Sequence, residues 1–244
     1  MPLIDLANPT RFLNLSGKLL PWLAAATAIA FAVGSVQVVG APDDYQQGAT
    51  AKIMFVHVPN AWLAMFVWVV MSLSALGTLV WRHPLADVAA KAAAPLGAAF
   101  TFIALVTGSL WGRPMWGTYW VWDARLTSVL VLFLMYLGLI ALWRTVDDPS
   151  RAGRAAAILT LVGAINLPII KFSVDWWNTL HQPASVFRAG GPTMSASFLV
   201  PLLVMALAFT LLFLTLHLAA MRNEILRRRV RTLQMMQAQS AVGA

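Results

Sequence analysis

The chain has 244 residues, of which 60% are hydrophobic and only 11% are charged. A water-soluble domain of this length leaves much of its surface exposed and cannot hide so much apolar material, so the composition excludes an ordinary soluble enzyme as well as a disordered chain. It is typical of a polytopic membrane protein. The net charge of +8 is then a signal for orientation in the membrane and not the footprint of a nucleic-acid partner.

The sequence lacks two features that particular cofactors and nucleotide binding require. The chain has no cysteine, which excludes disulfides, thiolate metal sites, iron–sulfur clusters and cofactor attachment through a C-x-x-C-H motif. It also has no phosphate-binding G-x-x-x-x-G-K-[ST] loop, because Gly17-Lys18 is followed by Leu19. Any ATP energy must therefore come from other subunits.

Six apolar segments of bilayer-spanning character follow one another along the chain. They are Leu19–Val39, Met54–Trp81, Ala92–Leu110, Leu126–Trp143, Ala155–Ile170 and Ser195–Ala219. The segments lack the alternation of β-barrel strands, and helices satisfy their own backbone hydrogen bonds in lipid. The sequence predicts an all-α protein with six transmembrane helices, formed by residues 1–244 as a single membrane domain.

Lys and Arg are distributed unequally between the two ends of these helices. The side that would carry both termini holds 12 of the 17, which places both termini in the cytoplasm by the positive-inside rule. The stretch Met1–Lys18 shows no cleavage motif and is interpreted as a retained cytoplasmic segment. The basic run Arg227–Arg231 suits binding to anionic membrane lipid, and a solvated tail that merely fixes topology explains it equally well.

The connection after the third predicted helix is rich in tryptophan. Four of the 11 tryptophans fall within 12 residues, at Trp111, Trp116, Trp120 and Trp122. An aromatic belt at the membrane surface explains one or two of them. Trp116 and Trp120 would share a face if the stretch is helical, and such a ledge would stack on a flat hydrophobic ligand.

Charged residues border this tryptophan-rich connection. Asp123 precedes the fourth predicted helix and is a natural N-cap. Arg125 falls in the first turn, where the helix dipole disfavours a cation, so we expect an anionic partner: either Asp123 or a ligand carboxylate bound bidentately. Arg113 is a weaker candidate for the same role.

Two of the four histidines fall on the side opposite the termini. His57 precedes Pro59, which suits the first position of a helix, so His57 is expected just outside the helix start. His181 follows the fifth predicted helix, whereas His83 and His217 fall on the other side. A single histidine is usually structural, but two at one depth beside a tryptophan-rich loop favour ligation.

Haem fits the description of a flat, apolar, anionic ligand that takes two imidazoles. Its iron accepts axial histidine, its ring packs against aromatic walls, and its propionates pair with Arg or Lys. Composition alone permits a quinone or another aromatic ligand equally.

The residues Trp116-Gly117-Thr118-Tyr119-Trp120-Val121-Trp122-Asp123 form the pattern W-G-x-x-W-x-W-D. This pattern resembles the tryptophan-rich signature of the haem-handling proteins of cytochrome c maturation. Phe102–Trp143 and Asn166–Gln182 resemble one family among them, the protein C family, and the resemblance covers nearly the whole chain. It departs at Thr127-Ser128-Val129, where Thr-Ser-Glu is expected, which puts in doubt only a local polar role at the start of the fourth helix.

The resemblance implies a six-helix bacterial inner-membrane protein that binds haem b without a covalent bond. It implies that His57 and His181 are the axial ligands of the haem iron and that Trp116 to Asp123 form the haem-handling loop. The implied partners are a membrane-anchored haem chaperone on the periplasmic face, ABC-type ATPase and permease subunits, and a small membrane subunit. The implied function is haem delivery, not catalysis.

Two other functions stay open at this stage. A permease subunit that moves a small apolar solute or haem would need a path through the bundle, and polar side chains in the spans are few beyond Asn166. An electron-transfer cytochrome b would need histidines within the spans, whereas His57 and His181 are expected at span ends or in loops.

Overall fold

The computed structural model describes residues 8–242. Its helices are α1 (Pro9–Gly40), the 3₁₀ helix η2 (Ala49–Ile53), α2 (Met54–Leu79), α3 (Ala86–Trp116), α4 (Ala124–Thr145), α5 (Pro149–Gly163), α6 (Asn166–Trp176) and α7 (Ala196–Val242). Counting η2 with α2, and α5 with α6, six helices are long and apolar enough to cross a membrane. The prediction of an all-α protein with six transmembrane helices is confirmed, and the chain is a multi-pass membrane protein.

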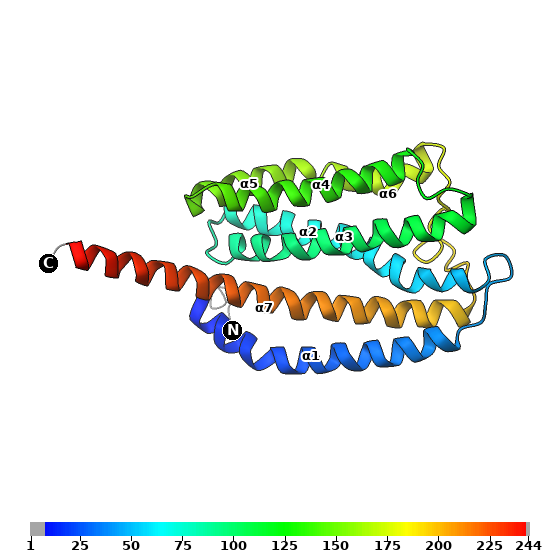
Figure 1. Ribbon diagram of the computed structural model, residues 1–244, viewed down its shortest axis with the longest axis horizontal. Coiled ribbons are helices and arrows are strands. Elements are labelled where there is room, and N and C mark those ends of the chain that lie inside the picture. The colour runs from blue at the N-terminus through cyan, green and yellow to red at the C-terminus, as the bar shows by residue number, and fades with distance from the viewer. Residues whose placement is uncertain (1–7, 243–244) are drawn as a thin grey trace.

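The helices form a bundle with α2 and α3 at its centre (Figure 1). On one side α1 packs along α7, and on the other side lie α4, α5 and α6. The start of α1 is joined to α7 at one end of the bundle, where Arg222 donates to the carbonyl oxygen of Leu13 and to Ser16 Oγ. We call this the basal end and the opposite one the distal end.

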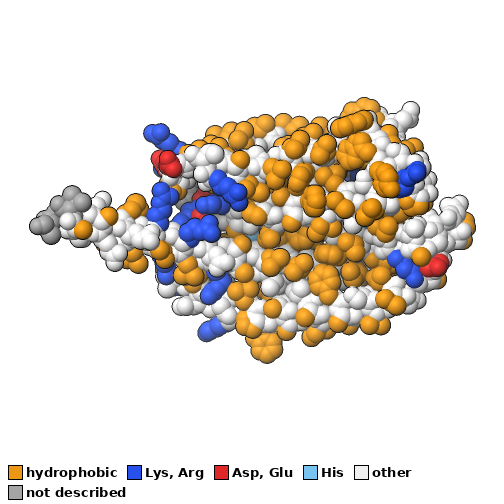
Figure 2. All heavy atoms as spheres, viewed as in Figure 1, with side chains coloured by type: hydrophobic (Ala, Val, Ile, Leu, Met, Phe, Trp, Pro, Cys, Tyr) orange, Lys and Arg blue, Asp and Glu red, His pale blue; other side chains and the backbone are white. Residues whose placement is uncertain are grey.

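The long axis of the bundle is wrapped in apolar side chains, whereas Lys and Arg gather near its ends (Figure 2). Large hydrophobic residues are exposed along the spans, among them Trp22, Ile29, Leu73 and Leu134. Such a surface is suited to contact with lipid, because an exposed apolar surface of this extent would aggregate in water.

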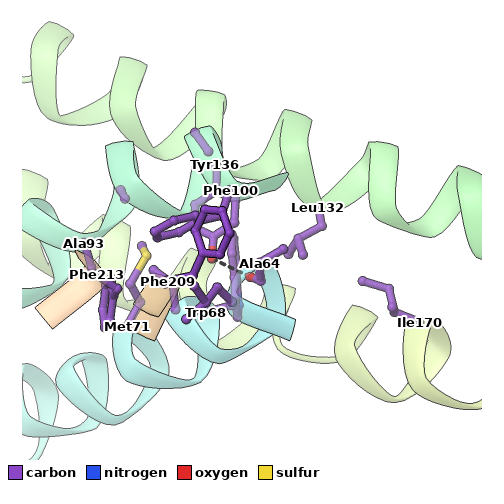
Figure 3. Close-up of a cluster of buried hydrophobic side chains, with 14 of the residues drawn as sticks. Ala64, Trp68, Met71, Ala93, Phe100, Leu132, Tyr136, Ile170, Phe209 and Phe213 are labelled. Carbon is purple, nitrogen blue, oxygen red and sulfur yellow. Dashed lines mark hydrogen bonds between the residues drawn. The ribbon is translucent and has the colours of Figure 1, made fainter. Parts of the chain in front are cut away.

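Aromatic residues join the central helices (Figure 3). Trp68 of α2 and Tyr136 of α4 are fully buried, with ring centroids 4.8 Å apart. Their polar atoms are satisfied by backbone carbonyls: Trp68 Nε1 donates to Thr160 at 3.0 Å and the Tyr136 hydroxyl to Ala64 at 2.8 Å. Gly97 of α3 lets the ring approach, because a Cβ there would lie 2.2 Å from Tyr136.

The fifth span is broken into two helices, which the sequence interpretation missed. Pro168 has no N–H to donate to the carbonyl oxygen of Ala164, and that oxygen instead accepts from Leu167 N in a tighter turn at 3.1 Å. Asn166 Nδ2 donates to the Ser128 carbonyl oxygen of α4 at 2.9 Å, as expected of a polar group at membrane depth. The break sets α6 against α4 beside the distal end.

Other boundaries also differ from the expectation. Pro59 is not the first residue of its helix, because η2 leads directly into α2 at Met54, and His57 therefore lies within the first turns of α2. Helix α3 continues to Trp116 and ends at Gly117, whose φ of 76° is left-handed and whose N–H donates to Arg113. Helix α7 runs on to Val242, well beyond the predicted end.

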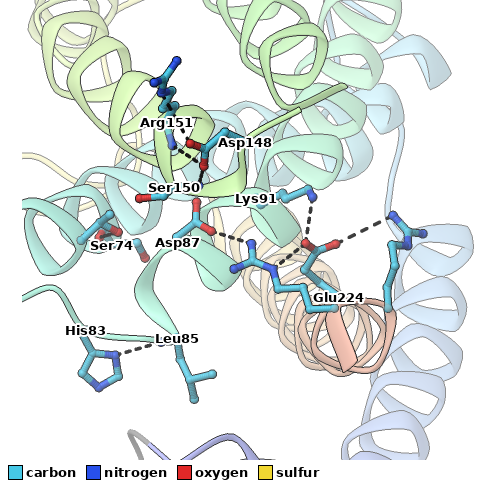
Figure 4. Close-up of polar contacts among 12 residues, drawn as sticks. Ser74, His83, Leu85, Asp87, Lys91, Asp148, Ser150, Arg151 and Glu224 are labelled. Atoms are coloured by element: carbon cyan, nitrogen blue, oxygen red, sulfur yellow. Dashed lines mark hydrogen bonds and ion pairs between the residues drawn. The ribbon is translucent and has the colours of Figure 1, made fainter. Parts of the chain in front are cut away.

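Ionic contacts fix the basal end of α7 against α3 (Figure 4). Glu224 is 7% exposed and accepts from Lys91 Nζ at 2.8 Å and from Arg228 Nε at 2.9 Å. Arg228 also pairs with Asp87. Because the charges are mutually paired where the apolar core ends, they set the position of α7 along the bundle axis.

Candidate functional site

The distal end holds a cavity of about 990 Å³. Its walls come from η2, α2, α3, α4, α6 and α7, together with the α1–η2, α3–α4 and α6–α7 connections. The cavity reaches inward along α7 as far as Thr210. Its size is that of a large cofactor site, and its lining is mainly apolar with a few convergent polar groups.

His57 lines this cavity from α2, and α3 fixes its ring. Its Nδ1 lies 3.0 Å from the carbonyl oxygen of Ala104 and 3.2 Å from Thr107 Oγ1. A carbonyl oxygen only accepts, so Nδ1 carries the proton, and the neutral ring keeps an unprotonated Nε2 for a ligand. Gly108 makes room for the imidazole, since a Cβ there would lie 2.8 Å from His57 Cε1. The Trp111 ring packs edge-on at 5.8 Å.

His181 lines the same cavity from the α6–α7 connection. Its ring centroid lies 5.0 Å from that of Trp116, and its backbone N–H donates to Thr179 Oγ1 at 3.1 Å. Burial, helped by the charge of Arg125 and by His57, lowers the pKa of His181 from 6.5 to about 4. Its buried Nδ1 has no hydrogen-bond partner within residues 8–242. The neutral imidazole is thus available to bind a metal.

The tryptophans divide into a lining set and an exposed one. Trp111, Trp116 and Trp120 line the cavity, and Trp111 Nε1 donates to Gln47 Oε1 at 2.8 Å. Trp122 is 75% exposed and packs edge-on against Trp120 at 5.4 Å. The hypothesis of a helical ledge shared by Trp116 and Trp120 is wrong, because α3 ends at Trp116 and Trp120 follows in a non-helical segment.

Asp123 connects two parts of the site. Its Oδ1 caps α4 by accepting from Leu126 N at 2.7 Å, as the sequence indicates. Its Oδ2 accepts from the Thr179 hydroxyl, which in turn holds the backbone of His181. Sequence reasoning missed Thr179, because a hydroxyl 56 residues away along the chain gives no local signal.

The two candidate arginines differ in position. Arg125 lines the cavity and donates to the carbonyl oxygen of Ile170 in α6. Arg113 does not line it: its guanidinium donates to Gly117 and lies 5.6 Å from the Tyr119 ring. The proposed carboxylate-binding role therefore suits Arg125 and not Arg113, while Val129, at the position of the expected carboxylate, lines the cavity as an apolar residue.

The residues that line the cavity fit haem. Two neutral-ring histidines line one cavity, one with its tautomer fixed by Ala104, and three tryptophans supply apolar walls. A cation at Arg125 suits an anionic substituent. These features define a class: a multi-pass membrane protein with an aromatic, bis-histidine cavity at the end opposite its termini.

Comparisons with known proteins identify the family. A sequence profile described as "Heme exporter protein C" matches residues 2–236. Heme exporter protein C of Bradyrhizobium diazoefficiens is 82% identical over 238 residues, which are 98% of this chain and 90% of the relative. The protein of that name from Paracoccus denitrificans is 47% identical, over 96% of this chain and 97% of its own length. The one from Escherichia coli strain K12 is 50% identical, over 91% of this chain and 90% of its own length.

The chain belongs to the heme exporter protein C family, whose members handle haem in cytochrome c biogenesis. The family resemblance indicated by the tryptophan-rich pattern at Trp116–Asp123 is thereby confirmed.

Proposed function

We propose that the protein binds haem b non-covalently in the distal cavity and delivers it to a membrane-anchored haem chaperone on the periplasmic face. The observation that carries the proposal is that His57 and His181, separated by 124 positions in sequence, line one cavity. In this proposal both imidazoles bind the haem iron, and Trp111, Trp116 and Trp120 surround the ring. Bound haem would supply an iron centre, and this chain would supply the two imidazoles that hold it.

Exposed aromatic residues beside the cavity suit a docking partner. Trp122 is 75% exposed, Tyr119 58% and Trp177 50%. Aromatic residues of this kind are enriched among the energetic hot spots of protein interfaces. We assign this surface to the acceptor of haem, so that delivery occurs where the cavity lies and no covalent chemistry or enzymatic step is required of this chain.

We infer the orientation in the membrane from the distribution of Lys and Arg, and the assembly from the name of the relatives. Since 12 of the 17 Lys and Arg fall on the side of the termini, we place both termini in the cytoplasm and the cavity at the periplasmic face of the bacterial inner membrane. The relatives are called heme exporter proteins, which suggests an assembly with ABC-type ATPase and permease subunits and a small membrane subunit. The basal arginines Arg227–Arg231 suit anionic lipid.

A permease path through this chain has less support. At the inner end of the cavity, the ring of Phe213 packs against Phe66, which lines the cavity, and against Phe100, with centroid distances of 6.0 Å and 6.3 Å. Phe213 is 1% exposed, so this part of the interior is filled. The distal cavity is better suited to holding a ligand than to conducting one.

Delivery is tested by co-expressing the protein with its chaperone, purifying the complex and scoring haem by absorbance on each partner. The Trp116→Ala, Trp120→Ala double variant should insert normally but leave the chaperone depleted of haem. The Trp116→Phe, Trp120→Phe double variant, which keeps an aromatic ring at both positions, is the control for the loss of side-chain volume. If the alanine double variant loads the chaperone with haem normally, these tryptophans serve only to anchor the loop in lipid, and the proposal is contradicted.

A further inference from the structure

The two long walls of the distal cavity differ in chemistry. On the α7 side the lining residues include Phe198, Leu202 and Ala206, which recur every four residues and form one apolar stripe. On the α4–α6 side the lining includes the cations Arg125 and Lys171. Because α7 and the α4–α6 pair lie on opposite sides of α2 (Figure 1), an enclosed ligand meets an apolar wall and a cationic wall.

Lys171 is the unexplained member of the cationic wall. It lies in α6, near the distal end of the fifth span, where it is exposed and lines the cavity. Within residues 8–242 no hydrogen bond or ion pair involves its ammonium group.

The face of α6 that carries Lys171 is turned to the cavity. Lys171, Val174 and Asp175 line it at helical spacing, whereas Phe172 and Trp176 stack on each other at 5.4 Å and do not line it. Lys171 is itself exposed, so it lies at the border of the cavity.

Arg125 is tied to the same part of α6. Its guanidinium donates to the carbonyl oxygen of Ile170, the residue that directly precedes Lys171. The remaining guanidinium N–H groups are free to bind another acceptor, since one arginine carries five donors. Two cations thus border one stretch of wall, an arrangement suited to a ligand with two carboxylates on one edge.

We propose that Lys171 and Arg125 together form a dicarboxylate-binding edge that orients the ligand, with its apolar edge against the α7 stripe of Phe198, Leu202 and Ala206. The inference rests on the proposed haem-binding function and adds the residue that recognises the second carboxylate. Lys171 is a specificity-determining residue in this assignment and Arg125 its partner. Asp175, one turn beyond Lys171, limits the net charge of the wall without pairing with Lys171 in the described structure.

The test compares two probes: iron mesoporphyrin IX, whose two carboxylates are ionised, and its dimethyl ester, in which both carboxylates are converted to neutral methyl esters. Both are titrated by absorbance into purified full-length protein in detergent. The unchanged protein should prefer the diacid. Lys171→Gln should weaken diacid binding about tenfold, the value of one charge-assisted hydrogen bond, and leave ester binding unchanged. Lys171→Arg should keep the preference.

Two controls make the result specific. Arg188→Gln removes an exposed cation of the α6–α7 connection that does not line the cavity, and it should leave both affinities unchanged. Ala206→Phe fills the apolar wall and should weaken diacid and ester alike. Size-exclusion profiles confirm that each variant is folded.

The outcomes separate this inference from the function on which it rests. If Lys171→Gln leaves the diacid-to-ester ratio unchanged, or weakens both probes equally, Lys171 does not recognise a carboxylate and the inference is overturned. If neither probe binds the unchanged protein, the haem-binding function itself fails.

Discussion

The imidazole of His57 donates from Nδ1 to the carbonyl oxygen of Ala104 at 3.0 Å, across the contact between α2 and α3. This bond selects one tautomer and one ring orientation, and it leaves Nε2 for the ligand. The candidate iron ligand on α2 is therefore positioned by the backbone of α3, and changes on α3 should alter binding through the ring of His57.

Gly108→Ala provides the sharpest test of that positioning. The new Cβ would lie 2.8 Å from His57 Cε1, so the ring must move, and we expect haem affinity to fall about tenfold. Alanine favours helix over glycine, so the substitution should not unfold α3. Gly138→Ala on α4, where a Cβ has no neighbour within 4 Å, is the matched control and should bind haem normally. Equal affinities for the two variants would contradict the packing.

The effect of replacing a histidine should depend on the end of the bundle at which that histidine lies. His57→Ala and His181→Ala are each expected to shift the absorption spectrum of bound haem or abolish its retention. His83→Ala, at the basal end, should do neither, because its ring serves only to accept from Leu85 N at 3.3 Å. Identical losses in all three variants would mean general destabilisation and remove the ligand assignment.

The pH dependence of binding follows from the low pKa of His181. Protons compete with a ligand for the imidazole only near or below the pKa of the free protein, here about 4. We expect ferric haem affinity to stay constant from about pH 7 to about pH 5, whereas an exposed histidine would begin to lose affinity near pH 6.5. Titrations at several pH values measure this, and a midpoint near 6.5 would show that His181 is solvated.

The same pKa predicts an acid-dependent loss of stability. The unfolded chain takes up a proton at His181 as the pH falls through 6.5, while the folded protein resists until about 4, so stability decreases across that window. In His181→Gln this part of the decrease should vanish, and its thermal midpoint should be less sensitive to pH between 6.5 and 4. A pH dependence unchanged from the parent protein would count against burial of this group.

Asp123 should prove to have two separable roles. Asp123→Ala removes the cap of α4, at a cost of about 1 kcal/mol, and also frees the Thr179 hydroxyl. Thr179→Val keeps the cap of α4 and removes both contacts of the Thr179 hydroxyl, with Asp123 and with the backbone N–H of His181. We therefore expect both variants to retain haem poorly, but only Asp123→Ala to lower the thermal midpoint. Normal haem retention by Thr179→Val would show that this bond does not position His181.

The basal ion pairs should matter for stability but not for binding. Glu224→Gln leaves Lys91 and Arg228 without their shared carboxylate at a site that is 7% exposed, and we expect destabilisation of about 3 kcal/mol. Asp148→Asn changes a carboxylate at the exposed start of α5, and should have a much smaller effect on the thermal midpoint. Haem spectra of both variants should match the parent protein.

Much of this architecture could be predicted from the chain alone. The six spans follow from runs of apolar residues, because a helix that crosses lipid must be apolar over its whole length. The cap at Asp123 is likewise local, since an N-cap side chain binds N–H groups within three residues of itself. The residue types of the site, two histidines and a cluster of tryptophans, were also visible as an unusual composition near the span ends.

Only the tertiary structure decided how these residues meet. Ala104 and Gly108 carry no sequence signal of their contact with His57, because that contact depends on how α2 and α3 pack across 47 positions. The break between α5 and α6 turns Lys171 toward the cavity, and no apolar pattern specifies that direction. The sequence determined which segments enter the membrane, since partitioning into lipid is a local property. Packing between distant helices determined the site, since cavities and hydrogen bonds depend on side chains that meet only in the folded bundle.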